Sequence, residues 1–305
     1  MKRELVTHPD GGTTALDWGD DDHSKALPKD APILVLFHTI TGSSEGTSYY
    51  YRAALKKGFR TVVFTRRGHG DLKLQTPKFN IMGDTSDAIA MMECVQKSYP
   101  ECKWIGLVGI SAGSGLMVSY LGQCGDNTPV KAGCSLCPAY DIEGALSNLK
   151  LKYPASDKYI LNCAKSLWFG NAEKKARMRS FDEDATEKCL KATTLLDFVH
   201  CHYRFAGHAT LSEYWKWHNP MSHYTGVKRP VLILNSDDDL VCVKENIRED
   251  LASEELNSLL IRTKYGSHVA YSEGWFGESN YMVRLSLDFM EACFVEDTTA
   301  GPELC

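Results

Sequence analysis

Residues 106–115 read GLVGISAGSG, and this stretch decides the fold. The apolar run 103–110 is typical of a buried strand, and a helical pattern follows it. Ser111 therefore lies in a strand-to-helix turn, with Gly109 two residues before it and Gly113 two residues after it. Larger side chains at the glycine positions would collide with the neighbouring strand and helix. The stretch predicts a strained turn that presents a serine hydroxyl as a nucleophile.

Strand-like and helical segments alternate on both sides of this turn. Five more runs are apolar on both faces, as the central strands of a parallel sheet are; they cover 32–37, 61–64, 130–137, 230–235 and 258–263. Helical patterns cover 84–98, 112–122, 243–254 and 280–293. The alternation predicts the α/β class, with a mostly parallel, doubly wound sheet.

The alternation stops between residues 139 and 228. This segment is helical in pattern and rich in Lys, Asp, Leu and aromatic residues. We interpret it as an inserted helical cap (lid), and residues 1–138 and 229–305 as the core domain. A cap at this place would cover the carboxyl ends of the strands, where open α/β sheets bind ligands.

A nucleophilic serine needs a base, and the base needs an orienting carboxylate. On sheets of this kind the order along the chain is Ser, then Asp or Glu, then His. Three aspartates directly follow the strand at 230–235, at positions 237–239. We predict Asp238 as the acid, because one residue separates it from an apolar pair, and Asp237 is the alternative.

Only one histidine lies downstream of these acids. It is His268, in a loop that follows the apolar run 258–263. Chain order therefore predicts Ser111, Asp238 and His268 as a catalytic triad. The oxyanion of the reaction needs two backbone N–H donors. We expect these from Ala112, which follows the serine, and from Ile40, in the loop after the strand at 32–37, with its neighbour Thr39 as the alternative.

The net charge, the targeting signals and the cysteine content exclude several classes of function and location. The formal charge of −5 gives no basic footprint for nucleic acid or anionic membranes. The sequence shows no signal peptide, membrane-spanning run, myristoylation glycine or terminal prenylation box. Eleven irregularly spaced cysteines indicate free thiols in a reducing compartment, so we expect a cytoplasmic protein. Cys134 and Cys137 form a CxxC that we interpret as buried strand residues, and we expect no metal or cofactor.

Several separate stretches resemble the AB-hydrolase 4 family of α/β-hydrolases. They are LFHTITGSS (36–44), TRRGHGDLKLQTPKFNIMGDTSD (65–87), LVGISAGSGLMVSYLG (107–122), FAGHATLSEYWKWHNP (205–220) and PVLILNSDDDLV (230–241). The resemblance spans roughly residues 30–290. It implies the α/β-hydrolase fold, the same three triad residues and an esterase, monoacylglycerol lipase or ethyl ester synthase activity. One departure is Thr39, which stands where the family has a glycine, so the oxyanion loop is expected to differ.

The function predicted from these features is a serine hydrolase of carboxylic esters. Its substrate would be a small-molecule or lipid-like ester, with medium-chain acyl groups or acylglycerols favoured. Two alternatives stay open at this point. The acyl group could pass to an alcohol or amine instead of water, or the chain could be a non-catalytic, ligand-binding homologue. The sequence does not indicate the oligomeric state.

Overall fold

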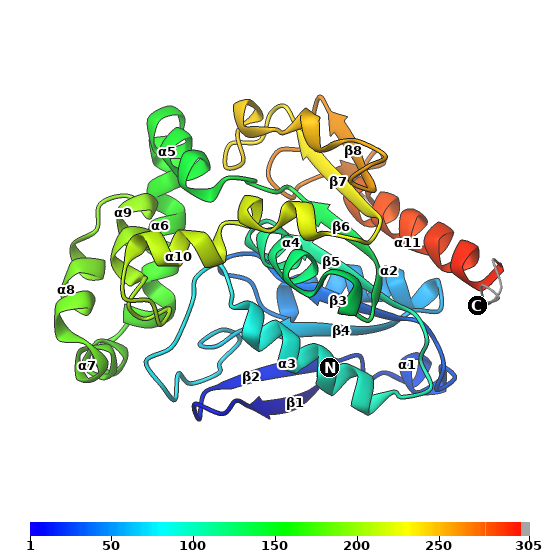
Figure 1. Cartoon of the computed structure of the whole chain (residues 1–305), viewed down its shortest axis with the longest axis horizontal. Helices are drawn as coiled ribbons and strands as arrows, with labels where there is room; N and C mark the ends of the chain where they lie inside the picture. The colour runs from blue at the N-terminus through cyan, green and yellow to red at the C-terminus, as the bar shows by residue number, and fades with distance from the viewer. Residues whose placement is uncertain (278, 300–305) are drawn as a thin grey trace.

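A computed structural model describes residues 1–277 and 279–299. Its main feature is a sheet of eight strands in the spatial order β1-β2-β4-β3-β5-β6-β7-β8 (Figure 1). The strands are β1 (Lys2–Thr7), β2 (Thr13–Trp18), β3 (Ile33–Phe37), β4 (Arg60–Thr65), β5 (Ile105–Ile110), β6 (Val130–Leu136), β7 (Val231–Ser236) and β8 (Ser258–Thr263). From β4 to β8 every pairing is parallel. The predicted fold class is confirmed.

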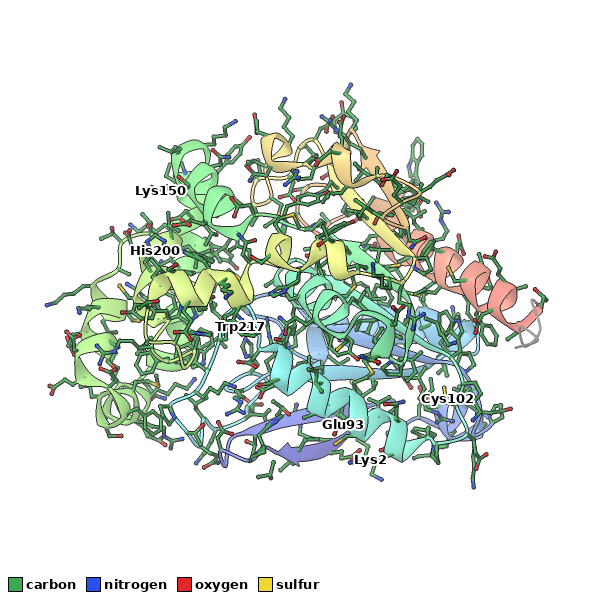
Figure 2. All side chains as sticks on the ribbon, viewed as in Figure 1. Lys2, Glu93, Cys102, Lys150, His200 and Trp217 are labelled. Carbon is green, nitrogen blue, oxygen red and sulfur yellow. The ribbon has the colours of Figure 1, made fainter. Side chains whose placement is uncertain are left out.

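Helices cover both faces of this sheet. They are α1 (Asp22–Ala26), α2 (Ser48–Lys56), α3 (Thr85–Ser98), α4 (Ala112–Cys124) and α11 (Tyr281–Thr299). Alternate residues of β3 show the two layers, because Val35 and Phe37 pack with α3 and α4, whereas Leu36 packs with α2 and α11. The exposed face of α3 carries polar side chains that point outward, among them Glu93 (Figure 2).

The sequence patterns missed two pairs of strands and the helices α1 and α2, and they overstated one helix. One missed pair, β9 (Ser272–Glu273) and β10 (Ser279–Asn280), forms a small antiparallel sheet of its own. β1 and β2 form an antiparallel hairpin at the edge beside β4. The helix expected at 243–254 is wrong, because this segment contains only the 3₁₀ turns Lys244–Asn246 and Glu249–Leu251. Its side chains bind other elements instead: Asn246 accepts a hydrogen bond from Asn148, and Glu249 pairs with Arg262 of β8.

Six helices lie between β6 and β7 in the sequence and form the left part of Figure 1. They are α5 (Ile142–Lys152), α6 (Pro154–Phe169), α7 (Ala172–Phe181), α8 (Glu183–Lys191), α9 (Leu195–His202) and α10 (Leu211–His218). Their apolar cluster also contains residues from the segment 74–82. Phe79 of this segment stacks on Trp168 and on Phe205, with ring centroids 4.3 and 5.2 Å apart. The predicted cap boundaries, 139 and 228, stay a prediction.

Two further expectations concern the surroundings of the protein. In the part of the chain that the structure describes, no helix combines the length and hydropathy needed to cross a membrane. The ten cysteines within that part are free, and Cys134 and Cys137 are buried as predicted. The remaining cysteine and the prenylation prediction fall in residues 300–305, outside the described residues. A cytoplasmic location stays a prediction.

Candidate active site

The serine turn has the strained geometry that its sequence predicts. Ser111 lies between β5 and α4 with φ = 55°, a conformation that non-glycine residues seldom adopt. A Cβ added to Gly109 would lie 2.4 Å from the carbonyl oxygen of Gly113. A Cβ added to Gly113 would lie 2.1 Å from the carbonyl oxygen of Phe37. Both glycines are therefore required for the close approach of α4 to β3 and β5.

A continuous hydrogen-bond chain runs from this serine to a buried carboxylate. The distance between Ser111 Oγ and His268 Nε2 is 2.9 Å, and that between His268 Nδ1 and Asp239 Oδ2 is also 2.9 Å. The Asp239 side chain is fully buried, and its other oxygen accepts the backbone N–H groups of Val241 and Cys242 at 2.7 and 2.8 Å. These bonds fix the carboxylate and leave one oxygen for the imidazole. The arrangement can make the serine nucleophilic.

The acid predicted from the sequence is wrong by one position. Asp238 is exposed, and its Oδ1 accepts the backbone N–H of Ser267 at 2.7 Å. Asp237 pairs with Arg262 at the surface. The two residues form the turn after β7, so their side chains point outward, and the chain turns back inward at Asp239. The spacing argument that favoured Asp238 took no account of this turn.

The two predicted oxyanion donors belong to residues that line the cavity containing the serine. Ile40 and Ala112 line the same cavity as Ser111 and His268. Within residues 1–277 and 279–299, neither backbone N–H has a hydrogen-bond acceptor. Two free donors on residues that line this cavity can bind an oxyanion.

Buried polar residues hold the backbone of this loop. The carbonyl oxygen of Thr39 accepts hydrogen bonds from Arg66 Nη2 at 2.5 Å and from His38 Nδ1 at 2.8 Å. Because a trans peptide unit directs its C=O and N–H to opposite sides, these bonds direct the Ile40 N–H away from Arg66. Thr39 needs no positive φ here. The family glycine is therefore replaced without backbone strain at this position.

Arg66 was not recognised from the sequence as part of this site. It is buried, and burial lowers the pKa of its guanidinium to about 9. Burial also lowers the pKa of His38 and lowers that of His69 to about 3, so both rings are neutral at pH 7. His69 Nε2 lies 3.0 Å from the carbonyl oxygen of Ile40. The sequence TRRGH could have indicated this role, because its first arginine, Arg66, directly follows β4 at the edge of the sheet that carries Ser111.

An apolar cavity of about 560 Å³ opens beside the hydrogen-bond chain. Its wall contains side chains from the inserted helices and from the loop after β7, among them Ile142, Leu146, Ile160, Leu195 and Val241. Aliphatic walls with polar groups at one end are typical of pockets for small ligands. The chemistry of this cavity suits an apolar ligand with a polar group near Ser111.

One cluster near the triad contains metal-type ligand atoms. Donor atoms of Cys137, Asp239 and His268 lie within 4.8 Å of one another. Burial, and then the charge of Asp239, raise the pKa of the Cys137 thiol to about 12, so this thiol is protonated at pH 7. The other two residues are hydrogen-bonded to each other. The expectation that no metal or cofactor takes part stays a prediction.

Comparison with known proteins identifies the class of protein to which this fold and this site belong. The family described as alpha/beta hydrolase fold matches residues 32–274, and the chain belongs to it. Among curated proteins, the chain is 29% identical over 302 residues to phospholipase ABHD3 of Bos taurus, covering 95% of this chain and 71% of that protein. It is 25% identical over 272 residues to a monoacylglycerol lipase of Saccharomyces cerevisiae, covering 84% and 57%.

A solved structure shows the same fold. The esterase Pf2001 of Pyrococcus furiosus superposes with a TM-score of 0.57 at 17% identity, over 95% of this chain and 92% of that chain. The membership in the α/β-hydrolase superfamily predicted from the sequence is thus confirmed. The activities in the names of the relatives support the prediction of a carboxylic ester hydrolase.

Proposed function

We propose that this chain is a serine hydrolase that cleaves carboxylic esters with Ser111, His268 and Asp239 as its catalytic triad. The observation that carries the proposal is the unbroken hydrogen-bond chain from the serine hydroxyl to the buried carboxylate, at the end of an apolar cavity. The relatives named phospholipase and monoacylglycerol lipase support lipid-like esters as the substrate class.

The first half of the reaction forms an acyl-enzyme. Ser111 Oγ attacks the ester carbonyl carbon while His268 Nε2 takes the hydroxyl proton. The negative charge that develops on the carbonyl oxygen is bound by the N–H groups of Ile40 and Ala112. The carbon–oxygen bond to the alcohol then breaks, and His268 gives its proton to the leaving alcohol.

The second half repeats these steps with water. Water attacks the acyl carbon, His268 takes one of its protons, and the bond to Ser111 Oγ breaks as the serine recovers a proton. The products are one carboxylic acid and one alcohol for each ester and water consumed. The Asp239 carboxylate orients the imidazole and stabilises its protonated form.

Active-site labelling tests the proposal. A fluorophosphonate probe should label the wild-type protein, and p-nitrophenyl esters of increasing acyl length should be hydrolysed. Ser111→Ala should abolish both, whereas Ser98→Ala, at the exposed end of α3, should change neither. A folded wild-type protein that neither reacts with the probe nor hydrolyses any ester of the series would refute the proposal.

A further inference from the structure

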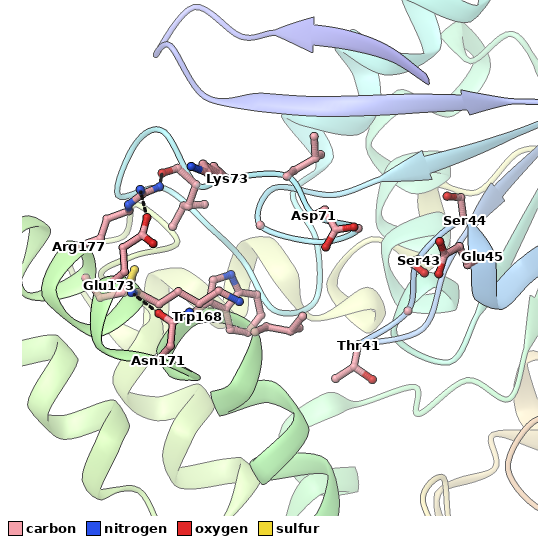
Figure 3. A pocket seen from close by; sticks show the side chains of 18 of the residues that line it. Thr41, Ser43, Ser44, Glu45, Asp71, Lys73, Trp168, Asn171, Glu173 and Arg177 are labelled. Atoms are coloured by element: carbon pink, nitrogen blue, oxygen red, sulfur yellow. Dashed lines mark hydrogen bonds and ion pairs between the residues drawn. The ribbon is translucent and has the colours of Figure 1, made fainter. Parts of the chain in front are cut away.

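The thiol of Cys137 lies close to the triad but outside the spaces that a substrate can enter. Cys137 directly follows β6 and is fully buried. It lines neither the apolar cavity beside the serine nor the cavity of about 450 Å³ between the loops at 41–45 and 70–74 and α7, which Figure 3 shows. Its sulfur nevertheless lies within 4.8 Å of donor atoms of Asp239 and His268. Any effect of this thiol on the reaction is therefore transmitted by other residues.

The backbone on both sides of His268 has an unfavourable conformation. Ser267 has φ = 47° and Val269 has φ = 58°, and for a β-branched residue this left-handed conformation is a clear outlier. Such a backbone persists only where the surrounding structure holds it. Oxygen atoms of the β7 segment hold one neighbour: Ser236 Oγ donates to the carbonyl oxygen of Ser267 at 2.9 Å, and Asp238 Oδ1 accepts the Ser267 N–H at 2.7 Å.

The thiol of Cys137 holds Val269, the neighbour on the other side. The Val269 N–H donates a hydrogen bond to Cys137 Sγ. In the described parts of the chain, no oxygen atom accepts this N–H. The same sulfur lies 3.9 Å from Tyr271 Oη, two residues further along the loop. A protonated thiol can accept one bond and donate another, so Cys137 binds the His268 loop at two points.

We propose that Cys137 is a positioning residue for His268. Its thiol holds the Val269 backbone, and this backbone holds the imidazole between Asp239 Oδ2 and Ser111 Oγ. The thiol touches no substrate atom and takes no proton in the reaction. This inference rests on the proposed ester hydrolysis at Ser111 and gives the second cysteine of the CxxC a role beyond burial.

Steady-state hydrolysis of p-nitrophenyl octanoate compares Cys137→Ala with a matched control, Cys134→Ala. Both cysteines are fully buried, but Cys134 Sγ lies 3.7 Å from the carbonyl oxygen of Ser286 on α11. Cys137→Ala leaves the Val269 N–H without its acceptor, so kcat should fall roughly tenfold with KM unchanged within about twofold. Cys134→Ala should change neither value. Cys137→Ser keeps one donor and one acceptor and should retain kcat within about threefold of wild type.

Relief of the backbone strain gives a second test. Glycine adopts positive φ without the steric cost that valine has, so a Val269→Gly variant needs less support from the thiol. In this background Cys137→Ala should lower kcat only about threefold or less. The double variant also carries the test if Cys137→Ala alone does not fold. A tenfold loss in both backgrounds would contradict a role that acts through the Val269 backbone.

A spectroscopic signal of the hydrogen bond between His268 and Asp239 separates the two proposals, because it needs no substrate. The proton on His268 Nδ1 should give a far-downfield proton NMR resonance, which Asp239→Asn removes and thereby assigns. Cys137→Ala should shift or broaden this resonance, and Cys134→Ala should not. If wild type shows this behaviour but hydrolyses no ester, the proposed function is refuted and the positioning role of Cys137 stands.

Two further results would overturn the inference. One is a folded Cys137→Ala variant with the kcat and the downfield resonance of wild type. The other is an equal loss of kcat and of thermal stability in Cys137→Ala and Cys134→Ala. The second result would assign the effect to a general loss of core packing rather than to the His268 loop.

Discussion

Replacing Asp239 by Asn tests the corrected triad. Asp239 Oδ1 accepts two backbone N–H groups, and Oδ2 faces His268 Nδ1. The carbonyl oxygen of Asn must therefore take the Oδ1 position, because two buried donors would otherwise lose their acceptor. The amide NH₂ group is then forced to face His268.

This exchange reverses the imidazole tautomer. A donor facing Nδ1 requires Nδ1 to be an acceptor, so the ring proton moves to Nε2, the atom that faces Ser111. Nε2 then cannot accept the serine proton. We expect kcat to fall about 10⁴-fold, as for the corresponding change in a serine protease, which corresponds to about 5.4 kcal/mol of activation free energy.

The assay is steady-state hydrolysis of p-nitrophenyl octanoate by Asp239→Asn and by its neighbour Asp238→Asn. The Asp238 variant keeps an oxygen that accepts the Ser267 N–H, so its kcat should stay within about threefold of wild type. Thermal unfolding of both variants checks that they are folded. A small loss for Asp239→Asn together with a large loss for Asp238→Asn would refute the reasoning and restore the acid predicted from the sequence.

Four other perturbations have defined outcomes. Arg66→Lys loses the planar fork that reaches the Thr39 oxygen, so kcat should fall roughly tenfold to a hundredfold with little change in KM; an unchanged kcat would contradict the role of Arg66 in holding the loop. Gly113→Ala places a Cβ 2.1 Å from Phe37 O and should reduce the unfolding free energy by roughly 2 kcal/mol or more in a denaturant titration, whereas Gly46→Ala, which meets no atom within 4 Å, should not. Ala145→Phe fills the apolar cavity and should lower the octanoate-to-acetate ratio of kcat/KM roughly tenfold, and an unaltered ratio would move the acyl site elsewhere. Burial lowers the pKa of His69 and His202 to about 3, so below about pH 6.5 the unfolded state binds more protons than the folded state. The free energy of unfolding should therefore fall from pH 6.5 towards pH 3, by up to about 1.4 kcal/mol per pH unit for each ring. His202→Gln should make this fall less steep.

The local chemistry of the serine turn could be predicted from the sequence. A sharp turn from a strand into a helix leaves no room for side chains at the positions of Gly109 and Gly113. The apolar patterns before and after Ser111 indicate the strand and the helix directly. The histidine could also be predicted, because chain order leaves only His268 downstream of the acids. The spacing of apolar residues and the order of residues along the chain are visible in the sequence, so both can be used without a structure.

Other features depended on contacts between distant segments. Spacing along the chain favoured Asp238 among three adjacent aspartates, but the turn after β7 buries Asp239 and exposes Asp238. The peptide before Ile40 is oriented by Arg66, which lies 27 residues from Thr39 in the sequence. The sequence thus determined the strand-to-helix turn that presents Ser111, whereas tertiary packing decided which aspartate meets His268 and which way the Ile40 N–H points, because burial and hydrogen-bond direction are set by segments that no local pattern connects.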